Sequence, residues 1–243
     1  MISINLNEIA GWGSAILGMR NPMSSWNKCD SGFVNLETYI HDGSKFKIGP
    51  NDLKLARKLA LAGTDHAKYR RMIVVWADIK APLYWWKEFD TYKVGTVANS
   101  CSTMHKIADK PFSLKDFSCE KLINYEALGT VHTVHADGES YDCPTTPAWI
   151  FDDLIKVLND CRDRYLETKD KKYWWQMIQL LPSSYNQTRM VMLNYEVLAN
   201  IYKSRRGHKL DEWREFCKWI EGLPYAADII FPWKGEKEKE KDT

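Results

Sequence analysis

The sequence predicts an α+β protein with a central, mostly antiparallel sheet and a helical second half. The first half contains one apolar, β-branched segment and a second segment that alternates polar and apolar residues around a glycine turn. After Pro147 apolar residues recur at helical spacing almost to the end of the chain. Strands followed by a run of helices are typical of the α+β class. We expect a single domain over residues 1–233 and a disordered, charged tail over 234–243.

The first predicted element after the N-terminal segment is a helix. Residues 51–63, "NDLKLARKLALAG", have Asn51 or Asp52 as a helix N-cap, and Gly63 lies just past the end. The first 50 residues match no part of the pattern; Arg20 and Trp26 there could cover a pocket, but we expect a surface loop.

A strand and a hairpin supply the predicted sheet. Residues 69–79, "YRRMIVVWADI", are β-branched and apolar enough for a largely buried strand. Pro82 suits the first turn of a helix that follows this strand. Residues 129–144 alternate with period two and include a glycine turn, so they predict a strand or a hairpin.

The second half predicts four helices. The first starts after Pro147 and directs one face inward, namely Trp149, Leu154, Ile155, Leu158, Cys161 and Tyr165. A shorter helix covers 170–180. Two more follow, with Asn194 and Asp211 near their starts and Gly207 and Gly222 near their ends.

Composition limits the classes of partner. Thirty-four Lys and Arg against 32 Asp and Glu give a net charge of +2, which argues against a binder of duplex nucleic acid. No apolar run approaches the roughly 20 residues that span a bilayer. The start of the chain lacks a secretion signal, and the six cysteines form no Cys-x-x-Cys pair, so we expect reduced thiols and a cytoplasmic protein.

Two residue pairs invite a catalytic or metal-binding reading. His132 and His135 would point to opposite faces of a strand, so they do not chelate a metal there, and we predict no metal site. Cys101 and His105 could meet as nucleophile and base on a helix, but the segment around them looks extended. We therefore assign no catalytic residue.

The later helices carry two charged clusters. One helix ends in Arg205, Arg206, His208 and Lys209, where cations complement the helix dipole or, alternatively, bind phosphate. Glu212 and Glu215 on the last long helix are expected to lie on its solvated face.

One stretch looks like the wall of a pocket. The bulky run "APLYWWKEF" is followed at once by residues 90–106, "DTYKVGTVANSCSTMHK", which are mostly small, hydroxyl-bearing or polar. A core does not need that change of character, whereas a binding pocket does.

In order and approximate spacing, residues 50–222 resemble the flavin-dependent thymidylate synthases. "HAKYRRMIVVWADIKAPLYWWKEFDTYK", "LLP", "NYEVLANIYKSR" and "DEWR" follow the family's His-x-Ser-x-x-Glu-His, Ile-x-x-Pro, Arg-His-Arg, Leu-Pro, Asn-x-Arg-x-Leu and Gln-x-Glu-Ile-Arg segments. The positions that match are His66, Ile79, Pro82, Leu181, Pro182, Asn194, Leu198, Arg205, Glu212 and Arg214.

The departures from the family fall on its flavin and nucleotide contacts. The Arg-His-Arg positions hold Thr91, Tyr92 and Lys93, and Thr96 replaces the following serine. Glu196 stands where the family has an arginine, and Arg71 where it has a glutamate. Losing a charge-assisted contact weakens the hold on an anionic cofactor, and a carboxylate there repels it.

The resemblance implies a nucleotide ligand, a homotetramer and, as the family's cofactor, FAD, whose binding these departures leave open. The expected phosphate-binding set is His66, Arg71, Lys93, Arg205 and Arg214. The expected base-stacking or pocket-wall set is Trp85, Trp86, Tyr92, Ser100, Cys101, Ser102 and Asn194.

Three functions follow as alternatives. The first is a nucleotide-binding protein without the family's methyl transfer, which sequesters or alters a nucleotide, in a viral role because members of this family also occur in phages. The second is an active FAD-dependent enzyme that modifies deoxyuridylate. The third is a structural or assembly protein whose tryptophans form subunit interfaces.

Overall fold

The computed structural model describes residues 2–33, 46–134 and 137–233. The chain forms two compact units. Unit 1 comprises Ala81–Tyr84 and Cys101–Gln187, and unit 2 comprises Ile2–Lys80, Trp85–Ser100 and the chain from Thr188 onward. That residues 1–233 behave as one domain stays a prediction, and the predicted disordered tail lies outside the described residues.

Unit 2 contains most of the four-stranded sheet. Its order is β1 (Ser3–Ala10), β4 (Val74–Pro82), β8 (Asn186–Asn194) and β5 (Val97–Ser100). β1 runs antiparallel to β4, and β5 runs antiparallel to β8. The α+β class and the mostly antiparallel sheet are therefore confirmed, although β1, β5 and β8 were not predicted.

β4 shows why the β-branched run forms a strand. Val75, Ala77 and Ile79 are fully buried and alternate with partly exposed residues, as the two-residue period of a strand requires. The predicted bounds were wrong at both ends. Lys68–Met72 form a 3₁₀ helix, η5, and Pro82 ends the strand instead of opening α3 (Leu83–Phe89).

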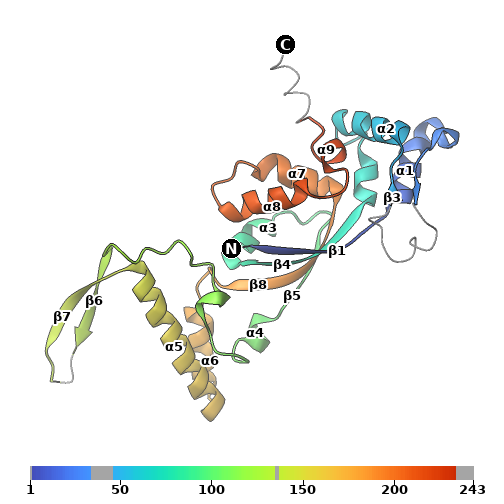
Figure 1. Ribbon diagram of the computed structural model, residues 1–243. Helices are drawn as coiled ribbons and strands as arrows, with labels where there is room; N and C mark the ends of the chain where they lie inside the picture. The colour runs from blue at the N-terminus through green and yellow to red at the C-terminus, as the bar shows by residue number, and fades with distance from the viewer. Residues whose placement is uncertain (1, 34–45, 135–136, 234–243) are drawn as a thin grey trace. The chain divides into compact units, whose positions relative to one another are not determined.

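The other helices of unit 2 are α1 (Trp12–Arg20), α2 (Pro50–Leu61), α7 (Tyr195–Arg205), α8 (Asp211–Glu221) and α9 (Ala226–Ile229). Figure 1 shows α7 and α8 together on one side of the sheet. Asn194 caps α7 by accepting a hydrogen bond from the backbone N–H of Val197, as predicted. Short elements complete the unit, namely η1 (Asn21–Met23), η2 (Trp26–Lys28), β2 (Gly32–Phe33) and β3 (Phe46–Lys47).

The N-terminal segment is part of the fold and not a surface loop. Its strand β1 forms one edge of the sheet, and Arg20 is buried against Asp52, with Nε 2.5 Å from Oδ1. Asp52 also accepts hydrogen bonds from Ser31 Oγ and the backbone N–H of Asp30. Asp52 is therefore a buried anchor, and α2 begins at Pro50 instead of being capped by Asn51 or Asp52.

Unit 1 is built on a helix pair and a hairpin. α5 (Pro147–Thr168) and α6 (Lys171–Leu180) pack side by side, and β6 (Gly129–Val134) pairs with β7 (Ser140–Thr145), so these predictions are confirmed (Figure 1). The unit also contains α4 (Thr103–Lys106) and η6 (Leu114–Asp116). Its core is formed by Ile107, Phe112, Phe117, Leu158 and Met177.

The predicted inward face of α5 is right for most of its length. Leu154, Ile155, Cys161 and Tyr165 pack against the core around Leu158. Trp149 was assigned wrongly, because it is 56% exposed in the first turn of the helix.

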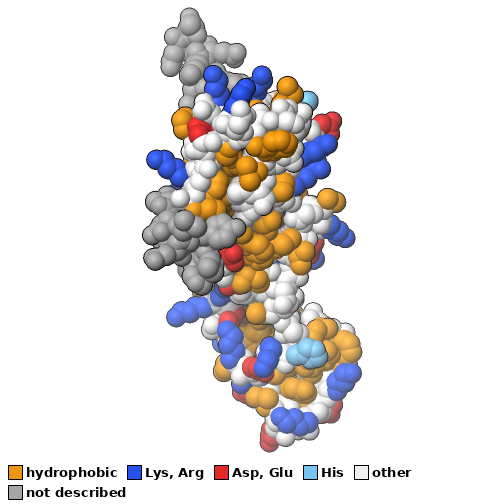
Figure 2. Space-filling view, turned by 90° about the vertical axis from the view of Figure 1, so that its right-hand side faces the viewer, with side chains coloured by type: hydrophobic (Ala, Val, Ile, Leu, Met, Phe, Trp, Pro, Cys, Tyr) orange, Lys and Arg blue, Asp and Glu red, His pale blue; other side chains and the backbone are white. Residues whose placement is uncertain are grey.

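Within the described residues no helix is long and apolar enough to cross a bilayer, and no group of three metal-ligating side chains comes together. On the face drawn in Figure 2, Lys and Arg side chains are scattered among apolar and neutral ones and do not form one basic surface.

Candidate functional site

An aromatic cluster in unit 2 supports the segment that the sequence marked as a pocket wall. Trp85 and Trp86 are 0% and 1% exposed, and Trp85 packs on Phe89, Trp213 and Phe216 with ring centroids 4.8 to 5.5 Å apart. Burial of these large rings stabilises the fold. The predicted base-stacking role of Trp85 and Trp86 does not fit, because neither ring has a face open to a ligand.

Arg205, at the end of α7, contacts this aromatic cluster and forms an ion pair with Glu88 on α3. Its Nη1 donates to Glu88 Oε2 at 2.8 Å, and its Nε donates to the hydroxyl of Tyr92 at 3.0 Å. The guanidinium lies 4.8 Å from the centroid of the Trp213 ring. Arg205 is therefore already paired with a carboxylate, and its clearest role is to hold Tyr92 in place.

Next to Tyr92 lies a cavity of about 290 Å³, which we call the Tyr92–Lys93 pocket. It is lined by Phe89, Asp90, Tyr92, Lys93, Thr96 and Ala98. Lys93 is exposed, whereas Asp90 pairs with Arg189 at 2.8 Å. No ion pair forms on Lys93 within the described residues, so the pocket presents the Tyr92 ring and an unpaired cation to a ligand.

One threonine that lines this pocket has a buried hydroxyl whose hydrogen bonding is unsatisfied within the described residues. Thr96 Oγ1 is buried and has no hydrogen-bond partner within the described residues. A buried hydroxyl without a partner is costly, so a ligand atom that bonded to it would gain free energy. Gly95 brings this turn close to α7, since its φ is +78° and an added Cβ would lie 2.6 Å from Asn194 Nδ2.

The remaining predicted phosphate ligands do not gather at this pocket. His66 is exposed in the turn before η5, and Arg71 is exposed on η5 itself. Arg214 donates to Asp211 and to the carbonyls of His208 and Lys209, so its donors are largely used locally. Of the predicted cations, Lys93 alone lines the Tyr92–Lys93 pocket.

The predicted polar wall residues have structural roles. Asn194 is the cap of α7, and Ser102 caps α4 by accepting a hydrogen bond from the backbone N–H of His105. Ser100 and Cys101 are exposed, and in the described chain no hydrogen bond joins Cys101 to His105. His132 bonds to Asp142 across the hairpin at 2.9 Å, and His135 lies outside the described residues.

Comparison of the fold with solved structures decides what this scaffold is. Thymidylate synthase X from Helicobacter pylori, in a crystal structure with FAD and dUMP, superposes with a TM-score of 0.61 at 14% identity, over 96% of this chain and 98% of that one. The chain has the fold of the flavin-dependent thymidylate synthases. The UMP/dUMP methylase PolB from Streptomyces cacaoi, bound with 5-Br dUMP, has a TM-score of 0.56 at 12% identity, over 94% of both chains. No protein-family model and no curated protein matches the sequence.

The positions that the sequence resemblance assigns to flavin contacts hold fewer free cations than the resemblance implies. Thr91 is neutral, and its hydroxyl donates to the carbonyl of Glu88. Glu196 is a buried carboxylate, whereas Arg205 is neutralised by Glu88. At these positions the phosphates of FAD would meet a neutral threonine, a carboxylate paired with Arg70 and an arginine paired with Glu88, and Lys93 is the one cation left to hold them.

This chain also has a second polar cavity, which was not predicted from the sequence. It measures about 450 Å³, and we call it the Arg70 cavity; its polar lining includes Arg70, Glu196, Asn200, Lys203 and Arg206. The predicted cation of η5 was Arg71, but Arg70 is the buried one. The only sequence signal was the spacing of Glu196, Lys203 and Arg206 along one helix face.

Two further ionisable side chains, Cys217 and Glu212, are buried on α8. Burial raises the pKa of the Cys217 thiol to about 12, which keeps it protonated and unreactive. Glu212, expected on the solvated face of α8, is buried instead, whereas Glu215 is exposed as predicted.

Proposed function

We propose that this protein binds a nucleotide in the Tyr92–Lys93 pocket and does not catalyse the methyl transfer of flavin-dependent thymidylate synthases. The observation that carries the proposal is a pocket lined by the Tyr92 ring, the exposed Lys93 and Thr96, whose hydroxyl has no hydrogen-bond partner within the described residues. These three groups suit three features of a nucleotide, which are the polar edge of its base, the flat face of the base and the phosphate.

Each part of the ligand has a partner in this pocket. Stacking of a base on Tyr92 contributes about 1 to 3 kcal/mol. The hydrogen bond from Arg205 to the Tyr92 hydroxyl holds that ring before the ligand arrives, which lowers the entropic cost of binding. Thr96 would bond to the base or sugar, and Lys93 would neutralise the phosphate. The volume of about 290 Å³ suits a mononucleotide that leaves its phosphate at the mouth.

The fold neighbours support a uridine nucleotide as the first ligand to test. The Helicobacter pylori enzyme was crystallised with dUMP, and PolB with 5-Br dUMP and with 5-Br UMP. The loss of methyl transfer is supported by the flavin-contact positions, where Thr91 and Glu196 replace cations. We expect a homotetramer in the cytoplasm, and light scattering of the purified protein measures the assembly.

Calorimetric titration tests the nucleotide site. Binding of dUMP, UMP, cyclic dinucleotides and NAD is measured with the wild-type protein, then the tightest ligand with Lys93→Ala and Thr96→Val. Both changes should raise Kd about tenfold or more, since each removes a direct contact. Lys87→Ala, an exposed lysine on α3, is the control with the same change in charge and should leave Kd unchanged.

Two outcomes contradict this proposal. Equal affinity of wild type, Lys93→Ala and Thr96→Val would show that the ligand does not sit in this pocket. Absence of binding by every nucleotide would instead favour a structural or assembly protein.

Incubation with FAD tests the alternative of an active flavoenzyme. We expect the desalted protein to be colourless and to make no methylated product from dUMP with FAD, a reductant and a one-carbon donor. Retained flavin absorbance together with turnover would establish the active enzyme and overturn this half of the proposal.

A further inference from the structure

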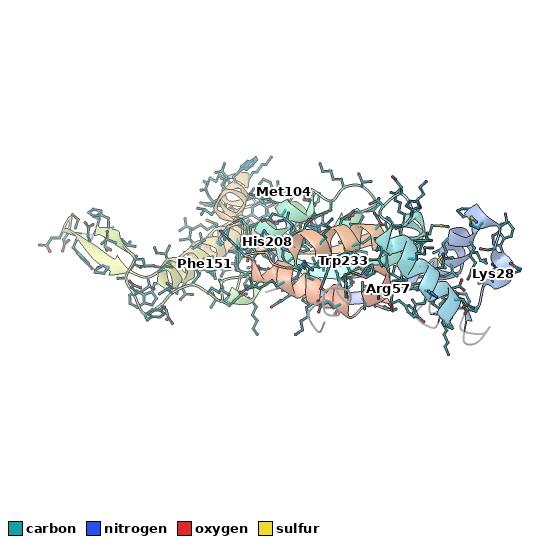
Figure 3. The ribbon with its side chains drawn as sticks, turned by 90° about the horizontal axis from the view of Figure 1, so that it is seen from above. Lys28, Arg57, Met104, Phe151, His208 and Trp233 are labelled. Carbon is teal, nitrogen blue, oxygen red and sulfur yellow. The ribbon has the colours of Figure 1, made fainter. Side chains whose placement is uncertain are left out.

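The hairpin of β6 and β7 in unit 1 is a two-stranded sheet with two open edges. Within the described residues β6 pairs with β7 alone, and no third strand adds to either side. Figure 1 and Figure 3 show the hairpin projecting from the start of α5, beyond Phe151. A two-stranded hairpin is only marginally stable in water, so a further strand would stabilise it.

The two edges of the hairpin differ in how they are protected. β7 carries Asp142 and Pro144, and a proline has no N–H to donate to a neighbouring strand. β6 has the sequence "GTVHTV" and contains no lysine, proline or carboxylate. Its valines and threonines are β-branched and favour an extended backbone. β6 is therefore the edge to which another extended chain can add.

One face of the hairpin is largely apolar. The strand register places four side chains on this face, namely Val131, Thr133, Tyr141 and Cys143. Val131 is 43% exposed and Tyr141 is 48% exposed, so the face is only partly covered. The other face is polar, and there His132 bonds to Asp142 across the two strands at 2.9 Å. A strand that joined β6 would cover more of the apolar face with its own apolar side chains.

The charge of the hairpin decides what kind of strand fits. Residues 122–155, which contain the hairpin, have six carboxylates and no lysine or arginine. Glu126 before β6 and Asp137 and Glu139 in the turn are exposed. A second copy of β6 would bring a second acidic hairpin alongside, and like charges repel. A segment that carries Lys or Arg is complementary instead, and its cations speed the encounter.

We propose that β6 is a docking edge for an extended, basic segment of another protein, which adds to the hairpin as a third strand. The backbone of that segment bonds to the outer edge of β6 over up to six residues, the length of the strand. Its side chains alternate, so that apolar ones cover Val131 and Tyr141 and basic ones lie on the face of Asp142. The docking edge shares no residue with the Tyr92–Lys93 pocket, so it does not depend on the proposed nucleotide site.

Two synthetic peptides test the docking edge with the full-length protein. Both carry a fluorophore and equal numbers of valines and lysines, which alternate in one peptide and are separated into two blocks in the other. Fluorescence anisotropy should show the alternating peptide binding at least about tenfold tighter, because it alone places its valines on one face of a strand. A peptide that alternates valine with glutamate should not bind.

Two matched pairs of variants locate the bound peptide. Val131→Thr removes a methyl group from the apolar face and should raise Kd about threefold or more, whereas Val134→Thr, on the opposite face of β6, should leave Kd unchanged. Glu126→Gln with Glu139→Gln should raise Kd about fivefold or more. The control for this change in charge is Glu167→Gln with Glu215→Gln, at exposed positions elsewhere, and it should bind like wild type.

Amide hydrogen exchange followed by NMR identifies the edge directly. Peptide binding should slow exchange at alternate amides of β6 and leave the amides of β7 unchanged. Protection of β7 instead, or equal affinity for the alternating and the block peptide, would overturn the assignment of β6 as a docking edge. Absence of binding by both peptides would overturn the proposal. Self-association of the wild-type protein in light scattering, weakened by Val131→Thr and not by Val134→Thr, would show that the edge takes a second copy and contradict a basic partner.

Discussion

Arg205 Nη1 donates to Glu88 Oε2 at 2.8 Å, and the indole N–H of Trp213 donates to the same oxygen at 2.9 Å. The arginine that matches the thymidylate synthase pattern is thus part of an internal ion pair that joins α7, α3 and α8. It orients Tyr92 through a further hydrogen bond, and so it shapes the pocket without needing to touch the ligand.

Replacing Arg205 should therefore lower stability before it changes recognition. In Arg205→Ala, Glu88 loses its charged partner and Trp213 loses the guanidinium above its ring, so we expect a loss of about 1 to 3 kcal/mol in the free energy of unfolding. Urea unfolding followed by tryptophan fluorescence measures this. Arg206→Ala, at the next and exposed position, should stay within about 0.5 kcal/mol of wild type. Equal stability of the two variants would contradict the structural role of Arg205.

The turn that closes the Tyr92–Lys93 pocket depends on a glycine. Gly95 has a φ of +78°, and a Cβ there would lie 2.6 Å from Asn194 Nδ2, the residue that caps α7. Gly95→Ala should cost about 1 to 2 kcal/mol in stability and should weaken nucleotide binding, because the turn must move.

Gly207→Ala is the matched control for Gly95→Ala. Gly207 has no positive φ, and an added Cβ would meet nothing within 4 Å. Thermal unfolding and nucleotide titration of both variants provide the comparison. A Gly95→Ala protein with wild-type stability and affinity would show that the pocket does not need this turn.

Asp52 should make the fold sensitive to acid. Burial raises the pKa of Asp52, but hydrogen bonds from Ser31, the Asp30 backbone and Arg20 outweigh it, so the net pKa lies below the ordinary value. A carboxyl group whose pKa is lowered on folding stabilises the protein above its unfolded pKa of about 3.9. That stability is lost as the pH falls through the lower folded pKa.

Urea unfolding at pH 7, pH 4 and pH 3 measures this effect. Wild-type stability should fall over that range, whereas Asp52→Asn should be less stable at pH 7 and should change less with pH. Asp153→Asn, at an exposed position on α5, should follow the wild-type curve. A wild-type slope retained in Asp52→Asn would assign the acid sensitivity to other groups.

The tryptophan cluster should contribute to stability and not to ligand binding. Trp85→Ala removes a fully buried indole and should cost about 3 to 5 kcal/mol. Trp149→Ala, at a position that is 56% exposed, should cost much less. Chemical denaturation compares the two. A loss of nucleotide binding in a folded Trp85→Phe variant would restore the stacking role.

Sequence patterns predicted the later helices and the hairpin of this fold. Helices α5, α6, α7 and α8 and the hairpin of β6 and β7 lie close to the predicted ranges, because amphipathic periodicity and helix caps act over a few residues. The order of the motifs also predicted the α+β fold that the structural neighbours confirm. The missed strands β1, β5 and β8 are stabilised by partners that are distant in sequence, and no local pattern reports those partners.

The sites were harder to predict, because side-chain direction and long-range pairing decide them. Lys93 and Tyr92 were predicted and do line a pocket, whereas Trp85 and Trp86 were assigned to a ligand and belong to the core. Thr96 was noted as a substitution, but its lack of a hydrogen-bond partner is visible only once the chain has folded around it.

By itself, the sequence determined the class of this fold, the positions of its later helices and the presence of a polar segment beside an aromatic one. Tertiary structure decided which charges are available to a ligand. Arg70 and Arg71 are adjacent and chemically identical, yet one is buried and the other is exposed, because successive residues of a 3₁₀ helix point about 120° apart. Which of the two faces inward depends on how η5 packs against α1 and α7, and that packing joins residues far apart in the chain.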